Sequence, residues 1–170
     1  MSLSPKPPRE SRLILSQLML PEHANTHGNV HGGWIMKLAD EAGGLCATRH
    51  SRRPCVTVAM DSMTFKQPVR VGELLELTAE VTWTGRSSIE VVVNVIAENP
   101  LTGDRVATNS AYLVYVALDE RGRPTPVPPL APETEAEEQR FAAGQKRQMY
   151  RTKNRKSEEI SPSTDTQSVI

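Results

Sequence analysis

A glycine-rich polar loop between Asn25 and Gly33 supplies the first groups that could take part in chemistry. It reads Asn-Thr-His-Gly-Asn-Val-His-Gly-Gly and runs directly into a segment of helical periodicity. Gly32 and Gly33 therefore lie at a helix N-terminus, where backbone N–H groups lack partners and the helix dipole is positive. Such a terminus can hold an anion or a developing oxyanion. No Gly-Lys-Ser/Thr follows, so the loop is not a nucleotide-binding P-loop.

Asp40 is the second candidate, because it lies on the flank of the helix that follows this loop. It falls between the apolar stripe and the polar face, beside Gly43. Gly43 and Gly44 each cost a helix interior about 1 kcal/mol relative to Ala. Glycine at such positions indicates that another backbone or a ligand passes close by. We therefore expect a half-buried carboxylate at a site, in preference to a packed helix with one surface Asp.

Other polar residues fit simpler roles. His23, His27 and His31 are spaced four apart, but the Asn and Gly content around them disfavours a helix, so we predict no metal site. Asp61 is either a polar residue at a strand edge or a partner of a catalytic group. The basic run over residues 146–156 is expected to be a solvated helix end.

The helix that must position Asp40 is predicted from Trp34 to about His50. Its apolar residues recur at helical spacing and form one stripe for a core. The stripe consists of Ile35, Leu38, Ala39, Ala42, Leu45 and Cys46.

The rest of the domain is predicted to be strand. Alternating apolar residues indicate strands over residues 12–20, 55–65, 73–84, 87–98 and 105–117. Tight turns join the last three strands as hairpins, so the sheet is antiparallel. One helix cannot cover both faces of this sheet. We expect a curved sheet wrapped around the helix, with its edge paired to another copy of the chain.

The length of 170 residues allows one domain with a core, plus tails. We predict a mobile Pro-rich leader over residues 1–10, the domain over 11–130, a C-terminal helix over 131–156 and a disordered polar tail over 157–170. The C-terminal helix opens with glutamates and closes with lysines and arginines, as the helix dipole favours.

The formal net charge is zero and aromatic residues are few, which argues against a general nucleic-acid binder. A local basic patch for a phosphorylated ligand is compatible with this charge. No apolar run is long enough to cross a bilayer, and the N-terminus does not read as a secretory signal. Two cysteines, Cys46 and Cys55, do not make a disulfide framework, so we expect reduced thiols in a cytoplasmic protein.

Three stretches together resemble the acyl-CoA hydrolase branch of the hotdog-fold thioesterases. They are Pro21-Glu-His-Ala-Asn25, Gly28-Asn-Val-His-Gly-Gly33 and Met36-Lys-Leu-Ala-Asp-Glu-Ala-Gly43. The sequence is similar both to single-hotdog bacterial enzymes and to two-hotdog cytosolic hydrolases of animals, over residues 13–130. The resemblance implies an α+β hotdog fold, and the order of elements read above agrees with it.

The resemblance also implies a reaction, the hydrolysis of fatty acyl-CoA to free acid and CoA. Asp40 would activate water or attack the thioester carbonyl, and we favour water. Asn25 would orient water or the carbonyl across a subunit interface, and the Gly33 N–H would stabilise the oxyanion. Gly32 and His31, in the same loop, are expected to contact the substrate.

Further features follow from the same resemblance. The segment Arg86, Ser87 and Ser88 matches one that lines the CoA channel. One half of the two-domain relatives carries the asparagine and the other carries the carboxylate, whereas this chain has both. A homodimer could therefore hold complete sites at both interfaces, and the relatives suggest a hexamer built as a trimer of dimers. No metal or cofactor is implied, because CoA is part of the substrate.

Two rival functions share the fold. A hotdog hydratase would need a histidine paired with a carboxylate, but the residue five beyond Asp40 is Leu45. A non-catalytic acyl-CoA sensor is the alternative, and the presence of Asp40 and Asn25 argues against it. No helix-turn-helix for DNA binding precedes the domain.

Overall fold

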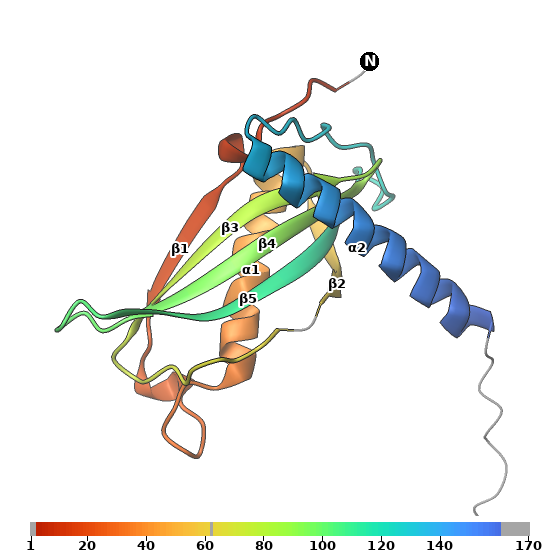
Figure 1. The fold of residues 1–170 in the computed structure, drawn as a ribbon. Coiled ribbons are helices and arrows are strands. Elements are labelled where there is room, and N and C mark those ends of the chain that lie inside the picture. Colours follow the sequence, from red (N-terminus) through yellow and green to blue (C-terminus); the bar gives the residue numbers. More distant parts are fainter. Residues whose placement is uncertain (1–2, 62, 161–170) are drawn as a thin grey trace, which may run out of the picture.

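Five antiparallel strands curl around one long helix (Figure 1). The computed structural model describes residues 3–61 and 63–160, with side chains up to residue 155. The strands are β1 (Leu13–Leu18), β2 (Cys55–Met60), β3 (Leu74–Thr84), β4 (Ser88–Glu98) and β5 (Arg105–Ala117). They pair in the order β1-β3-β4-β5-β2, so β1 and β2 form the two edges. Helix α1 (Gly32–Ser51) packs on the inner face, and α2 (Glu135–Ile160) crosses the outer face. The expected α+β hotdog fold is confirmed.

Helix α1 begins at a side-chain cap and ends at a left-handed residue. His31 is the N-cap, and Arg52 ends the helix with φ of 56°. The buried face includes Ile35, Leu38, Ala39, Ala42, Gly43, Cys46, Ala47 and His50. The prediction for Leu45 was wrong, because this side chain is 52% exposed. The sheet covers the side of α1 that carries the glycine and alanines, and Leu45 points away from it.

The alternation in the strands predicted their inner faces. Inward residues of β3, β4 and β5 are fully or almost fully buried against α1 and include Leu75, Leu77, Val91, Val93, Leu113 and Tyr115. Strand β2 was predicted to continue to Phe65 but ends at Met60, where its pairing with Leu113 of β5 is the last in the register. Beyond Met60, the N–H groups of Asp61 and Lys66 still donate to the carbonyls of Tyr112 and Thr108 in β5.

The segment before β1 is tied to the domain, which corrects the predicted mobile leader over residues 1–10 for the part that is described. Lys6 forms a bridge with Leu130, and its ammonium donates to the carbonyl of His50. Pro8 is buried in a short 3-10 helix over Pro8–Glu10, and Arg9 pairs with Glu133. Residues 1–2 lie outside the described part of the chain.

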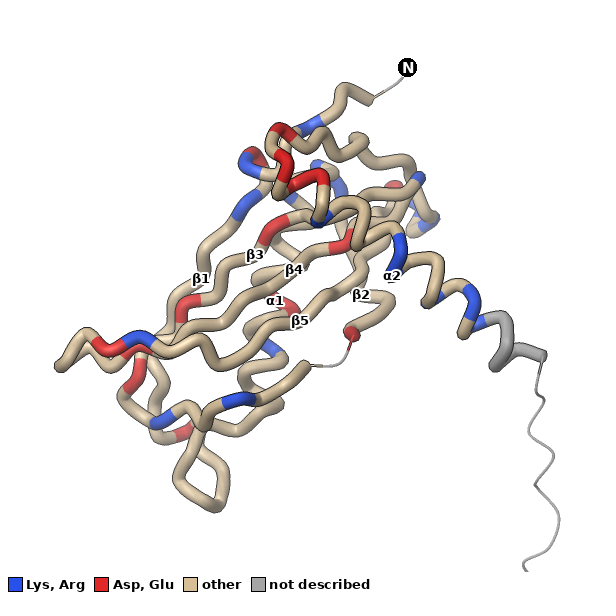
Figure 2. The backbone as a smooth tube through the Cα atoms, viewed as in Figure 1, with Lys and Arg blue, Asp and Glu red and all other residues tan. Residues whose placement is uncertain are grey.

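Helix α2 starts at a capping box and lies on the sheet through ion pairs. The Glu137 N–H donates to the Thr134 hydroxyl, and the Glu137 carboxylate accepts from the Thr134 N–H, which fixes the start at Glu135. The helix continues to Ile160, beyond the predicted end at residue 156, and the rest of the predicted tail lies outside the described residues. Figure 2 shows acidic residues near its start and basic residues along its later turns.

The sequence suggested that the basic turns of α2 are solvated, but two of their arginines bind a buried carboxylate. Glu90 of β4 has 0% exposure and accepts hydrogen bonds from Arg147 and Arg151 of α2. Burial alone would raise the pKa of Glu90, but the hydrogen bonds from Arg147, Thr82 and Arg151 outweigh it and lower that pKa. Asp61 pairs with Arg151, so it belongs to this network. Neither α1 nor the described part of α2 is apolar enough to span a membrane.

Candidate active site

Asp40 is half-buried on the flank of α1 that faces β2 and β5. The Thr57 hydroxyl donates to Oδ1 of Asp40 over 2.7 Å. The Tyr115 hydroxyl donates to the backbone carbonyl of Asp40 over 3.0 Å and lies 3.3 Å from the same Oδ1. Within the described residues, no hydrogen bond reaches Oδ2, so one carboxylate oxygen is held and the other is available to a ligand.

The sheet register brings these two hydroxyl donors together. Thr57 of β2 pairs directly with Tyr115 of β5, so both side chains face α1 as cross-strand neighbours. The register shifts just after Thr57, where the strand carries an extra residue before Ala59. Bulges of this kind redirect side chains and are frequent beside active sites.

Glycine in α1 makes room for the tyrosine. A Cβ at Gly43 would clash with the hydroxyl oxygen of Tyr115 and lie 3.1 Å from its ring carbon Cζ. The sequence predicted a close approach at Gly43, and the group that approaches is this phenol. Burial, followed by the negative charge of Asp40, raises the pKa of Tyr115, so the phenol stays protonated and acts as a donor.

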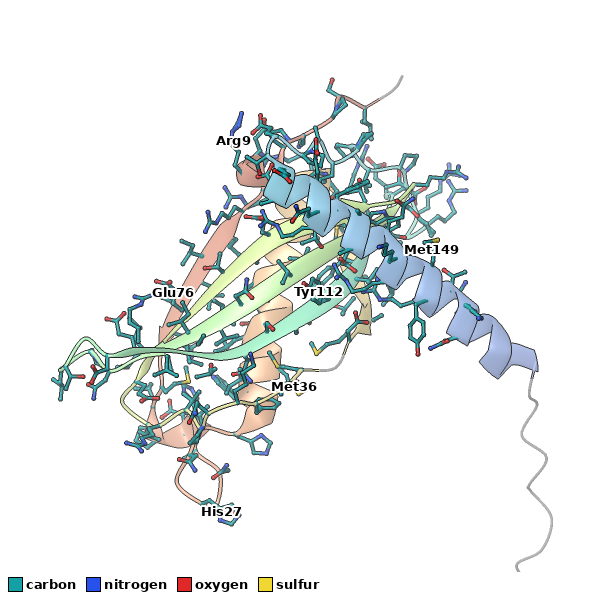
Figure 3. The ribbon with its side chains drawn as sticks, viewed as in Figure 1. Arg9, His27, Met36, Glu76, Tyr112 and Met149 are labelled. Carbon is teal, nitrogen blue, oxygen red and sulfur yellow. The ribbon has the colours of Figure 1, made fainter. Side chains whose placement is uncertain are left out.

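The loop residues form a second group of polar atoms. Oδ1 of Asn25 accepts from the N–H of His27 and of Asn29, at 2.8 and 3.3 Å, which closes the loop on itself. His27 lies at the tip of this loop (Figure 3). Asn25 and Gly32 line a pocket of about 310 Å³ that also includes Phe65.

The Gly33 N–H already has a partner inside the chain. It donates to Nδ1 of His31 over 3.0 Å, and this is the N-cap bond of α1. His31 is exposed, so its ring can rotate away. An anion that uses the Gly33 N–H must therefore displace the His31 ring.

Asp40 and the loop groups are not brought together within one chain. Gly33 and Asp40 are seven residues apart on α1, which corresponds to roughly 10 Å along the helix axis. No hydrogen bond joins Asp40 to Asn25 in the described residues, and Asp40 does not line the pocket that contains Asn25. The predicted catalytic residues thus lie in two separate groups within one chain.

The predicted CoA-channel segment is also divided. Ser88 lines a groove of about 360 Å³ between β2 and α2, together with Arg151 and Arg155. Arg86 is exposed on the β3–β4 turn and does not line this groove. The backbone carbonyls of Arg86 and Ser87 accept from Val127 and Ala117, so these residues anchor the turn.

Cys46 lies in the core of the domain. Burial raises the pKa of Cys46 to about 12, so its thiol is a protonated core group. No group of His, Cys, Asp or Glu suited to a metal ion is found among the described side chains, residues 3–61 and 63–155.

Thr57 and Tyr115 were missed by the sequence analysis. Tyr115 occupies an inward position of β5, where alternation alone predicts core packing. In β2, alternation grouped the valines on one face and Thr57 on the other, but Val56 and Val58 are 44% and 55% exposed and Thr57 is the residue that faces α1. The available signal was the polar Thr57 between valines, but only the register shows that it meets Asp40.

Comparisons with known proteins identify the family and the fold of this chain. Residues 27–103 match the Thioesterase superfamily. An uncharacterised acyl-CoA thioester hydrolase of Bacillus subtilis is 40% identical over 129 residues, which cover 76% of this chain and 75% of that protein. The human cytosolic acyl coenzyme A thioester hydrolase is 38% identical over 81% of this chain, which corresponds to 37% of its own length.

Solved structures show the same fold. A hexameric acyl-CoA thioesterase in its apo form has a TM-score of 0.85 and 39% identity, and the match covers 89% of this chain and 97% of that one. An acyl-CoA hydrolase of Staphylococcus aureus, solved with butyryl coenzyme A, coenzyme A and coenzyme A disulfide, has a TM-score of 0.84 and 30% identity over 91% of this chain and 94% of that one. The same hydrolase has been solved as alanine variants of an aspartate, an asparagine and a threonine.

Proposed function

Since this chain belongs to the thioesterase superfamily, we propose that it hydrolyses fatty acyl-CoA to free fatty acid and CoA, with Asp40 activating the water. The observation that carries this proposal is the half-held carboxylate: Thr57 fixes Oδ1 of Asp40, and Oδ2 is left for a water molecule. The substituted residues in the Staphylococcus aureus hydrolase have the order and separations of Asn25, Asp40 and Thr57, which supports the assignment.

The chemistry requires few groups. Oδ2 of Asp40 takes a proton from water as the water oxygen bonds to the thioester carbon, and the carbonyl oxygen becomes an oxyanion. When the tetrahedral intermediate collapses, the C–S bond breaks and the thiolate leaves with its electron pair. Because a thiolate is a good leaving group, no strong acid is needed, and the proton held by Asp40 can return to the sulfur.

The oxyanion and the water need donors that Asp40 lacks in its own chain. The axial separation of roughly 10 Å between Gly33 and Asp40 excludes both from one reacting centre in a protomer. We therefore assign the second half-site to a partner subunit, whose Gly33 N–H, freed from His31, and Asn25 would face Asp40. Strand β2 carries Thr57 and is an edge of the sheet, so its outer backbone groups can pair with a second copy.

The groove at Ser88 is assigned to the CoA part of the substrate. Arg151 and Arg155 line it, and guanidinium groups suit the phosphates of CoA. Val58 and Ala59 of β2 line the same groove, so it begins next to the strand that holds Thr57. Arg86 and Ser87 lie on the adjacent turn.

The assembly and location are also proposals. The apo thioesterase with the same fold is described as hexameric, which supports a trimer of dimers for this chain. A cytosolic location is supported by the name of the human relative.

An assay of thiol release from a panel of saturated acyl-CoA substrates tests the function. We expect Asp40→Asn to lower kcat by about 10²- to 10⁴-fold, because it removes the general base but keeps the shape. Glu41→Gln, next along α1 and paired with Lys37 on the exposed face, is the matched control and should retain activity.

Two outcomes contradict the proposal. If the wild-type protein binds acyl-CoA without releasing CoA, the protein is a non-catalytic sensor. If Asp40→Asn matches Glu41→Gln in kcat, Asp40 does not activate water.

A further inference from the structure

We infer that Tyr115 is a positioning residue that holds the Asp40 carboxylate for reaction through its hydroxyl, which fits into a notch at Gly43. This inference rests on the proposed function, because it takes Asp40 as the base. Tyr115 is 1% exposed and does not itself reach the substrate.

The hydroxyl of Tyr115 contacts Asp40 at two atoms. It lies 3.0 Å from the backbone carbonyl oxygen and 3.3 Å from Oδ1. It has a single proton, which is shared between these two acceptors. The tyrosine thus contacts both the main chain and the side chain of the same residue.

Thr57 and Tyr115 hold the same oxygen from two strands. Thr57 donates to Oδ1 from edge strand β2, and Tyr115 approaches Oδ1 from the adjoining β5. Two donors on one oxygen restrict rotation of the carboxylate about its last bond, so Oδ2 keeps one direction. Reaction rates respond strongly to such orientation, because small misplacements of a reacting group cost large factors in rate.

The contact between the Tyr115 hydroxyl and Asp40 also requires a glycine at position 43. With any side chain at this position, Cβ would clash with the Tyr115 hydroxyl oxygen. The hydroxyl would then have to move away from Asp40. A mid-helix glycine is unfavourable by about 1 kcal/mol relative to alanine, so Gly43 makes room for the hydroxyl at a cost to the stability of the helix.

The first test is Tyr115→Phe in the full chain, assayed with the acyl-CoA panel. We expect kcat to fall about tenfold with KM changed less than about twofold, because binding is intact and only orientation is lost. Tyr112→Phe is the matched control. Its ring lies on the outer face beneath Arg147 (Figure 3), so its kcat should stay at the wild-type value.

The Asp40→Asn background separates positioning from folding. If Tyr115 acts through the Asp40 carboxylate, Tyr115→Phe should not lower the residual rate of Asp40→Asn any further. The same tenfold fall in both backgrounds would overturn the inference, as would an unchanged kcat or an effect confined to KM in the single variant. If Asp40→Asn is itself as active as wild type, the proposed function fails instead.

Gly43→Ala gives a second and independent measurement. We expect it to lower kcat when Tyr115 is present and to add less than about threefold when combined with Tyr115→Phe, because the hydroxyl it displaces is already absent. Fully additive losses in kcat would contradict the notch. If Tyr115→Phe folds poorly, kcat of Gly43→Ala is measured in the wild-type and Asp40→Asn backgrounds instead. A loss only in the wild-type background supports the positioning role of Tyr115, and an equal loss in both contradicts it.

Discussion

The carboxylates of Glu90 and Asp40 lie in opposite surroundings. Glu90 is fully buried and bonded by two arginines, so its charge is neutralised and it is committed to holding α2. Among the described residues, the partners of the Asp40 carboxylate are the neutral hydroxyls of Thr57 and Tyr115, on one of its oxygens. Neutral donors fix the direction of a carboxylate without cancelling its charge. This difference supports the proposed catalytic role of Asp40 and a structural role for Glu90.

His50 gives a prediction about pH at the residue scale. It is fully buried, its Nδ1 lies 2.9 Å from the Ser11 hydroxyl, and its Nε2 lies 2.9 Å from the carbonyl of Pro128. A carbonyl only accepts, so Nε2 carries the proton in the neutral ring. Burial lowers the pKa of His50 below its ordinary value of 6.5.

The unfolded chain binds a proton at His50 more readily than the folded chain does. The contribution of neutral, buried His50 to the free energy of unfolding is therefore complete above about pH 6.5 and is lost as pH falls through the lower pKa of the folded state. We expect Tm to fall more between about pH 7.5 and pH 5 for wild type than for His50→Gln. His27→Gln, in the exposed loop, should behave like wild type. Equal pH dependence in wild type and His50→Gln would contradict this assignment.

At the scale of elements, α2 is attached mainly through charge. Arg147 forms a pair with the buried Glu90, whereas Arg140, two turns earlier, pairs with Glu80 near the surface. Removing Arg147 leaves the fully buried charge of Glu90 with only Arg151 and the Thr82 hydroxyl as partners, which is costly, whereas a surface pair contributes little.

We therefore expect Arg147→Gln to lower the free energy of unfolding by about 3 kcal/mol and Arg140→Gln by less than about 1 kcal/mol. Denaturant unfolding measures both variants. A similar cost for the two would mean that α2 is not attached through Glu90.

Periodicity predicted most elements, because strand alternation and the stripe of α1 are local patterns. Alternation places Glu90 on the face of β4 opposite Ile89 and Val91, but it could not show that α2 covers that face. The same limit hid Tyr115, which has the alternation of a core residue. The sequence predicted a curved sheet around the helix, but it could not show which inward side chain of β5 would reach Asp40. The predicted leader was wrong for a similar reason, because Lys6 is held by Leu130, far away in sequence.

At the scale of the whole molecule, the two half-sites predict complementation. An Asn25→Ala subunit lacks one half-site and an Asp40→Ala subunit lacks the other. A mixed dimer has two composite sites: one carries both substitutions and the other carries neither. We expect each variant alone to be nearly inactive and an equal, randomly exchanged mixture to recover about a quarter of wild-type activity.

Thiol release after denaturing and refolding the mixture measures the recovery. Refolding each variant alone is the control. Activity no higher in the mixture than in either parent would place the complete site within one chain.

The distance between Gly33 and Asp40 along α1 has a kinetic consequence. If catalysis needs two protomers, the rate at high dilution grows with the square of the protomer concentration, and the specific activity falls toward zero as the protein is diluted. A change in the amount of the chain, by synthesis or degradation, would then change the hydrolysis rate by a larger factor than the amount itself. Protein abundance itself would act as a threshold on the hydrolysis of the acyl-CoA pool.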